Sequence, residues 1–238
     1  MDRISDPEGM TLNSEELCYV PDSFLCYSPL DGAAEVGELP VRASGRITFG
    51  SFNNAPKISP RCIELWAAAL NAVPNSRLLL KSGQFSDEGV RGKLLESFSK
   101  QGIEPSRIEL RGRTMDTGSH LDMYQEMDIA LDSFPYNGTT TTCEALWMGV
   151  PVVSLCGTRH ASRVGASLLH VVGLEDLVVD SVDAFATCAK GLAEDLDRLS
   201  DLRRGMRQRL KDSPLMDEVG FAKKMSEAFH TMVSPQTV

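Results

Sequence analysis

From Arg46 onward, short apolar segments alternate with longer segments whose apolar residues recur at helical spacing. This alternation with short connections predicts an α/β fold, a Rossmann-like, doubly wound parallel sheet. The expected strands are Ile47–Phe52, Arg77–Lys81, Arg107–Arg111, Asp128–Phe134, Pro151–Leu155 and Leu177–Val179. Ligands of such sheets bind at the carboxyl ends of the strands, so we expect the functional residues in the loops that follow them.

Helices are expected between these strands. Ser59 and Pro60 open one of them, as N-cap and first helical residue. Ser119 is expected to cap another, with Asp122 at the capping-box position. The remaining helices are expected at about 86–101, at Thr140–Met148 and Arg159–Val171, and over most of 181–230.

Residues 1–45 differ from the rest of the chain. They hold four prolines and several glycines and show no sustained periodicity, which predicts an extended lead-in with at most one short strand. A structureless run of this length is unusual inside a compact domain. We therefore expect it to pack on a part of the protein that lies outside this chain.

Charge and cysteine usage exclude several function classes. With 24 basic and 33 acidic residues the net charge is −9, which argues against nucleic-acid binding and against docking on anionic lipid. The longest apolar stretch, Leu65–Leu70, is far shorter than the roughly 20 residues of a membrane span. The six cysteines form no C-x-x-C pair, so we expect free thiols, a cytoplasmic location and no metal site.

The richest motif is Phe134–Glu144, Phe-Pro-Tyr-Asn-Gly followed by four threonines, Cys143 and Glu144, between a strand end and a helix start. A helix N-terminus offers unpaired N–H groups and a positive dipole end, which favour phosphate. Four consecutive threonines are poor helix formers, so helix propensity does not explain them. Glu144 lies one turn into the expected helix, where its carboxylate could hold the hydroxyls of a ribose. The alternative is an ordinary capped helix.

Three further loops carry candidate residues. Lys57 lies just ahead of a helix N-terminus, where a bound anion would relieve its conflict with the dipole; the alternative is a solvated lysine. His120 is either a ligand-binding or a structural histidine. Residues 157–165, which include His160 and two arginines, are either a sugar or diphosphate contact or a surface helix start.

Residues 47–54, Lys57-Ile58, the motif 134–151 and the segment His160–Gly165 together resemble glycosyltransferase family 41. This is the family of protein O-GlcNAc transferases and SPINDLY-type protein O-fucosyltransferases, and the bacterial members look most similar. The resemblance implies a GT-B fold, of which this chain would be the C-terminal, donor-binding lobe. It also implies packing against an N-terminal lobe and tetratricopeptide repeats that this chain lacks.

The resemblance assigns roles to individual residues. Lys57 would contact the donor diphosphate and neutralise the leaving group, which makes it the catalytic candidate. The other expected nucleotide-sugar contacts are Asn54, Met115, His120, Thr139, Thr140, Thr141, Glu144 and His160. Asn54 and Thr117 depart from the residues of the animal enzyme, so the nucleotide-sugar donor is left open between UDP-GlcNAc and GDP-fucose.

The implied reaction is inverting, metal-independent transfer of a sugar to a Ser or Thr hydroxyl of an acceptor protein. The expected organisation is a lead-in at 1–45, a nucleotide-sugar-binding lobe at 46–215 and a C-terminal helix and tail at 216–238. Because the acceptor groove would lie largely on the missing lobe, we expect the isolated chain to bind nucleotide but to transfer sugar poorly, or to be a non-catalytic nucleotide-sugar-binding fragment.

Overall fold

The computed structural model describes residues 1–8, 13–114 and 116–233. Its centre is a six-stranded sheet in the order β3-β2-β1-β4-β5-β6, in which every neighbouring pair is parallel. The strands are β1 (Ile47–Ser51), β2 (Ser76–Lys81), β3 (Ile108–Arg111), β4 (Ile129–Leu131), β5 (Val152–Leu155) and β6 (Val178–Val179). The predicted doubly wound parallel sheet is confirmed.

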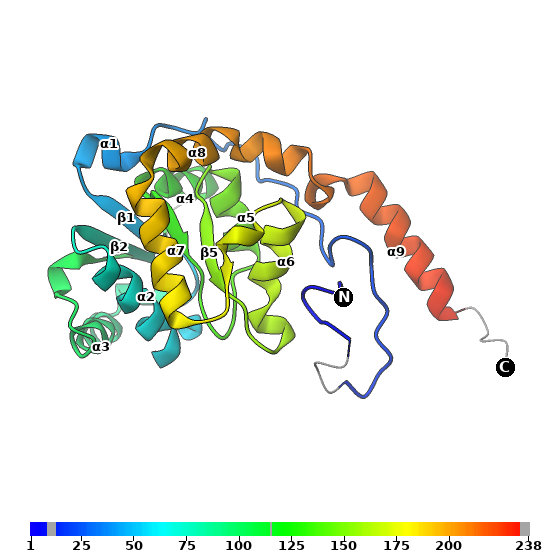
Figure 1. Ribbon diagram of the computed structural model, residues 1–238, viewed down its shortest axis with the longest axis horizontal. Helices are drawn as coiled ribbons and strands as arrows, with labels where there is room; N and C mark the ends of the chain where they lie inside the picture. Colours follow the sequence, from blue (N-terminus) through cyan, green and yellow to red (C-terminus); the bar gives the residue numbers. More distant parts are fainter. Residues whose placement is uncertain (9–12, 115, 234–238) are drawn as a thin grey trace.

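Helices cover both faces of this sheet, which is why the central strands are apolar along their whole length. Leu78, Leu79 and Leu80 of β2 are fully buried, as expected for a parallel strand with a layer on each side. The helices are α1 (Pro40–Ser44), α2 (Pro60–Ala72), α3 (Glu88–Ser99), α4 (Thr117–Asp122), α5 (Thr140–Trp147), α6 (Val164–Val171), α7 (Val182–Glu194), α8 (Leu196–Lys211) and α9 (Glu218–Val233). Helix α7 returns across the sheet and packs on α2 (Figure 1).

The order in which successive strands are added to the sheet reverses beside β1. From β1 the chain proceeds to β2 and β3 on one side, and β4 lies on the other side of β1 and leads to β5 and β6. Right-handed crossovers therefore place α2 and α3 on one face and α5 and α6 on the other. Such a reversal opens a crevice outside the carboxyl ends of the two central strands, where ligands bind.

Helix starts agree with the sequence at Pro60 and at Thr140 and differ at two other positions. The Ser59 hydroxyl accepts the Cys62 N–H and caps α2, as predicted. Ser119 does not cap α4: Asp116 is the N-cap, and its carboxylate accepts the Ser119 N–H at 2.8 Å. Both residue types are good N-caps, so composition alone could not choose between them. The helix expected from Arg159 begins as a 3₁₀ turn at His160–Ser162, and α6 starts at Val164.

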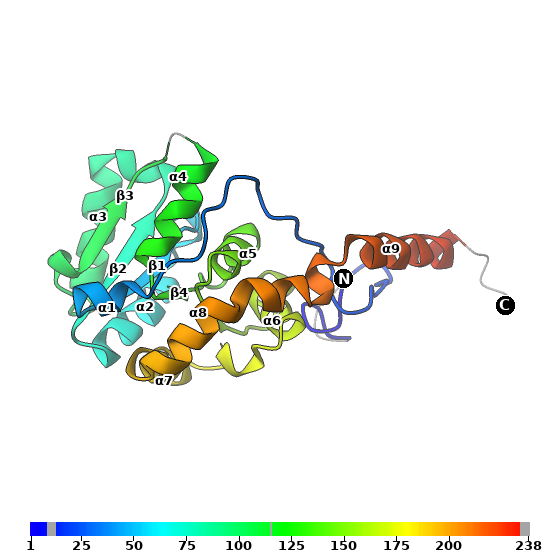
Figure 2. The same ribbon diagram turned by 90° about the horizontal axis from the view of Figure 1, so that it is seen from above.

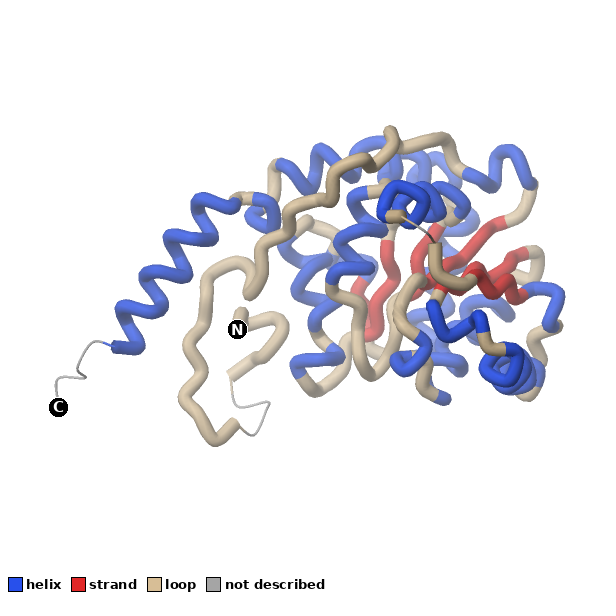
Figure 3. The backbone as a smooth tube through the Cα atoms, turned by 180° about the vertical axis from the view of Figure 1, so that it is seen from behind, coloured by secondary structure: helices blue, strands red, loops and turns tan. Residues whose placement is uncertain are grey.

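One strand expectation also needs correction. The strand predicted at Asp128–Phe134 is only three residues long, Ile129–Leu131, although the Asp132 N–H still donates to the Val153 carbonyl of β5 at 3.0 Å. Residues 1–8 and 13–45 contain no strand, which agrees with an extended lead-in of at most one short strand; their regular element is α1 (Figure 3).

The lead-in segment lies on this same lobe. Arginine side chains of the lobe donate to its backbone carbonyls: Arg203 to Gly37 at 2.8 Å, and Arg163 to Ile4 at 2.8 Å. The buried Asp2 carboxylate accepts the Ser167 hydroxyl at 2.6 Å. At the other end of the chain, α9 extends away from the sheet (Figure 2). Within residues 1–8, 13–114 and 116–233, no helix is both long and apolar enough to cross a membrane.

Candidate functional site

The start of α5 presents a row of unused N–H groups. The first bond within this helix runs from the Cys143 N–H to the Thr139 carbonyl, and Thr139 makes no side-chain cap. In the described part of the chain, the N–H groups of residues 139–142 therefore have no acceptor. Together with the helix dipole they form an anion-binding end, as the threonine motif predicted.

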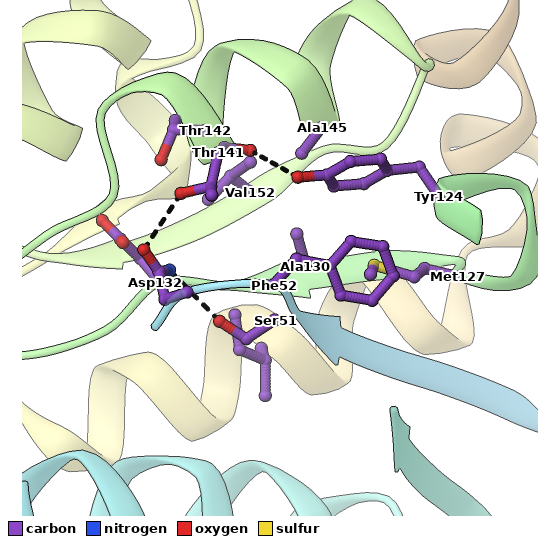
Figure 4. A pocket seen from close by; sticks show the side chains of 12 residues that line it. Ser51, Phe52, Tyr124, Met127, Ala130, Asp132, Thr141, Thr142, Ala145 and Val152 are labelled. Atoms are coloured by element: carbon purple, nitrogen blue, oxygen red, sulfur yellow. Dashed lines mark hydrogen bonds between the residues drawn. The ribbon is translucent and has the colours of Figure 1, made fainter. Parts of the chain in front are cut away.

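Gly138 allows this helix start to fold tightly. A Cβ at this position would lie 2.6 Å from the Thr141 hydroxyl oxygen and 2.7 Å from that of Thr142. The Thr141 hydroxyl in turn donates to Asn53 Oδ1 at 3.0 Å, and the Asn53 amide donates to Ser51 at 3.2 Å. Figure 4 shows this chain of contacts, which joins the end of β1 to the threonine helix around a void of only about 10 Å³.

A cavity of about 440 Å³ opens beside this helix start. It adjoins a second cavity of about 320 Å³, with which it shares Lys81, Arg113 and His120. The residues that line the larger cavity are Phe52, Asn54, Lys81, Ser82, Gly83, Gln84, Arg113, His120, Thr140, Thr141 and Glu144. They come from the end of β2, from the segments that follow β1, β2 and β3, and from helices α4 and α5, so the cavity lies at the carboxyl edge of the sheet.

Five of the predicted contact residues thus meet in one place: Asn54, His120, Thr140, Thr141 and Glu144. Two of them touch directly, because His120 Nε2 lies 2.9 Å from Glu144 Oε2. Tyr124 donates its hydroxyl to the same carboxylate oxygen at 3.0 Å. Burial and the Glu144 charge together raise the pKa of Tyr124, so its hydroxyl stays a donor.

The catalytic candidate Lys57 lies against the loop that precedes α5. Its ammonium donates to the Asn137 carbonyl at 2.8 Å and sits 4.2 Å from the centre of the Tyr136 ring. Burial lowers the pKa of Lys57, and the negative charge of Asp132 opposes that change. Lys57 is not among the residues that line the cavity.

The remaining predicted residues lie elsewhere. Thr139 is the N-cap of α5. His160 packs edge-on against Phe24 of the lead-in, with ring centres 5.1 Å apart, and is not a lining residue of the cavity. Met115 lies outside the described residues.

Asp132 organises the loop that carries these groups, and sequence reasoning did not select it. One of its carboxylate oxygens accepts the Gly138 N–H at 2.7 Å and the Ser133 N–H at 2.8 Å. The other accepts the Ser154 hydroxyl at 2.6 Å. Burial raises the pKa of Asp132 to about 6, although these hydrogen bonds and Lys57 favour the ionised form.

Lys81 and Tyr124 were also missed as site residues, whereas Phe52 and Asn53 lay in the segment 47–54 that carried the resemblance but were given no role of their own. Lys81 ends a predicted strand, and this position at the carboxyl edge was the signal that could have selected it. Tyr124 fits the apolar spacing of its helix, so nothing in the pattern distinguished it from a core residue.

Comparison with known proteins identifies the family. The sequence model described as "Glycosyl transferase family 41" matches residues 37–225, which include the sheet and the whole cavity. The chain belongs to glycosyltransferase family 41.

Individual members of the family align with nearly the whole chain. The chain is 43% identical over 232 residues to the "Probable UDP-N-acetylglucosamine--peptide N-acetylglucosaminyltransferase SPINDLY" of Solanum lycopersicum, covering 97% of this chain and 25% of that protein. It is 30% identical over 187 residues to the "UDP-N-acetylglucosamine--peptide N-acetylglucosaminyltransferase" of Caenorhabditis elegans, covering 78% of this chain and 16% of that protein. The chain therefore spans about a quarter or less of these relatives.

A solved structure supports the same assignment. A mutant of the Thermobaculum terrenum O-GlcNAc transferase superposes with a TM-score of 0.81 at 34% identity, over 92% of this chain and 41% of that one. The sucrose-phosphate synthase of Thermosynechococcus elongatus shares the fold, with a TM-score of 0.60 at 19% identity. The expected GT-B type of lobe is thus confirmed for this family 41 chain.

Proposed function

We propose that this family 41 chain is the donor-binding lobe of a protein O-glycosyltransferase that takes N-acetylglucosamine from UDP-GlcNAc to Ser or Thr hydroxyls. The observation that carries the proposal is the start of α5, where unused N–H groups of residues 139–142 lie beside a 440 Å³ cavity. The names of the relatives in tomato and Caenorhabditis elegans both state UDP-N-acetylglucosamine as the donor.

The proposed role of the site is to stabilise the departing nucleoside diphosphate. Negative charge develops on the diphosphate as the bond to the sugar breaks, and fixed donors aimed at it lower the barrier. The α5 N–H groups would supply fixed partial charge, and Lys57, which uses one ammonium hydrogen on Asn137, would supply a full positive charge. We propose inverting transfer without a metal ion, with the leaving-group charge met by these groups alone.

The proposal extends to parts of the protein outside this chain. We infer that the lobe at 46–215 works with an N-terminal lobe, which would hold most of the acceptor groove, and with tetratricopeptide repeats. Residues 1–45 would lead in from that lobe, and residues 216–238 would form the C-terminal helix and tail. The six cysteines are all unpaired, which supports a reducing cytoplasmic location.

Calorimetric titration with UDP and with GDP tests this function. We expect saturable UDP binding, and we expect Lys57→Ala to weaken it by about tenfold or more, because a charge-assisted hydrogen bond is lost. Lys93→Ala is the matched control, since Lys93 is exposed on α3 and lines neither of the two adjoining cavities. The control should bind like the wild type.

Each other outcome has a definite meaning. Tighter binding of GDP than of UDP would replace the GlcNAc donor by GDP-fucose. Binding that Lys57→Ala leaves unchanged would remove Lys57 from the site. A folded chain that binds neither nucleotide would contradict the donor-binding role itself.

A further inference from the structure

Lys81 makes a contact that restricts the chemistry of His120. Its Nζ lies 2.5 Å from His120 Nδ1 at the edge of the cavity. An ammonium group has only donors, so Nδ1 must be the acceptor in this contact. His120 is then the neutral imidazole that carries its proton on Nε2.

That tautomer is the one that Glu144 requires. His120 Nε2 faces Glu144 Oε2 at 2.9 Å, and only an Nε2–H can donate across this distance. The opposite tautomer would set a nitrogen lone pair against the carboxylate. Lys81, His120 and Glu144 therefore form one directed chain of hydrogen bonds that starts from a lysine at the end of β2 and ends on α5.

The chain of bonds occupies only half of the Glu144 carboxylate. Oε2 accepts from both His120 and Tyr124, while within the described residues nothing donates to Oε1. Glu144 is 5% exposed, and it lines the cavity one turn beyond the unused N–H groups of α5. A carboxylate held by one oxygen in this way offers the other as an acceptor in a fixed position.

Other charged or titratable groups near His120 do not supply this constraint. Arg113 lines the same cavity, but its side chain is exposed and makes no hydrogen bond within the described residues. Tyr124 meets His120 ring to ring, with centres 5.5 Å apart, and its hydroxyl goes to Glu144. Phe52 packs 5.9 Å from the imidazole and is apolar. Among these neighbours, Lys81 is the group that hydrogen-bonds to Nδ1.

We propose that Lys81 is a positioning residue that fixes the His120 tautomer and thereby aims the free oxygen of Glu144 at the vicinal hydroxyls of a nucleotide ribose. This inference rests on the proposed nucleotide-binding function and adds a specificity element to it. Lys81 acts through His120 and Glu144, so it selects for the ribose rather than for the phosphates.

The test compares a ribonucleotide with its deoxy analogue. Wild-type chain should bind UDP about tenfold more tightly than 2′-deoxy-UDP, since the deoxy analogue lacks one hydrogen bond to a charged carboxylate. Lys81→Met should reduce this preference to less than about threefold by weakening UDP binding and leaving 2′-deoxy-UDP nearly unchanged. Lys81→Arg, which also has only donors, should restore part of the preference. GDP and 2′-deoxy-GDP serve as the second pair.

Side-chain ¹⁵N NMR reports on the tautomer without any ligand. In the wild type we expect His120 to carry its proton on Nε2 only, with the signal assigned through His120→Gln. In Lys81→Met, no donor holds Nδ1 as an acceptor, so we expect an Nδ1–H tautomer to appear, in which His120 no longer donates to Glu144. Retained binding of 2′-deoxy-UDP shows that the Met variant is folded.

Four results would overturn the inference. An Nδ1–H tautomer in the wild type contradicts its premise. Equal weakening of both nucleotides by Lys81→Met would show that Lys81 only attracts the diphosphate by its charge. An unchanged preference for UDP in that variant would remove Lys81 from the site and leave the proposed function intact. Failure of the folded wild type to bind any of the four nucleotides would overturn the proposed function and this inference together.

Discussion

Replacing Gly165 with alanine should lower the free energy of unfolding by about 3 kcal/mol, at the upper end of the range for overpacking a core. Gly165 lies in the first turn of α6, and a Cβ there would overlap the Ser154 hydroxyl and lie 2.5 Å from Asp132 Oδ2. Neither neighbour can retreat without breaking the hydrogen bond between Ser154 and Asp132. The Gly165 N–H also donates to Asn137 at 3.2 Å, so the loop before α5 should be displaced.

Urea unfolding measures this change, and Gly191→Ala is its control. Gly191 also lies in a helix, α7, but a Cβ there has nothing within 4 Å. Alanine at that position should stabilise the protein by about 0.5–1 kcal/mol through helix propensity alone. If both substitutions stabilise the protein, the close packing of α6 on the Asp132 carboxylate is wrong.

Replacing Asp132 with asparagine should change stability by an amount that depends strongly on pH. A carboxyl whose pKa rises from 3.8 unfolded to about 6 folded makes the wild type about 3 kcal/mol less stable above pH 6 than below pH 4. Between these values the unfolded chain releases the proton while the folded chain keeps it, so stability falls as pH rises. Asparagine does not titrate and can still accept from Gly138 and donate to Ser154.

The stability of Asp132→Asn relative to the wild type should therefore increase by about 2 kcal/mol from pH 4 to pH 7, most of the full difference. Asp116→Asn should show the opposite dependence of relative stability on pH. The Ser119 hydroxyl and N–H lower the pKa of Asp116, so that variant should lose stability relative to the wild type as pH rises. Unfolding curves at pH 4, 5.5 and 7 measure both. A difference between Asp132→Asn and the wild type that stays constant with pH would show that the carboxyl is not destabilised by burial.

Much of the fold was predictable because its signals are local. Apolar runs such as Leu78–Leu80 predict buried strands, and Ser59-Pro60 predicts a helix start, since each depends only on neighbouring residues. Where two local signals compete, as Asp116 and Ser119 do at α4, the pattern does not decide. The end of β4 was not visible in the pattern, because the residues after Leu131 bond within the loop before α5: the Asp132 carboxylate accepts the Gly138 N–H, and the Ser133 hydroxyl donates to the Tyr136 carbonyl.

The candidate site was predictable residue by residue but not as an assembly. The threonine motif and Glu144 follow from helix-terminus chemistry. Lys57 and His120 were candidates from their places near helix starts, and the family resemblance assigned their roles. That His120 and Glu144 touch, and that Lys81 and Tyr124 complete their contacts, depends on loops 20 to 40 residues apart in sequence. No periodicity encodes such distances, so these contacts required the three-dimensional arrangement.

The parallel pairing of β1 with β4 has a consequence for how the chain folds. It joins Phe49 to Ile129 and Gly50 to Ala130, residues 80 positions apart, and the crevice lies beside this pair. Closing so long a loop costs entropy before any contact compensates for it, so the pairing is expected late in folding. The groups that would hold a nucleotide assemble only once it has formed. A bound donor would therefore stabilise the completed lobe by mass action and leave partly folded chains unaffected.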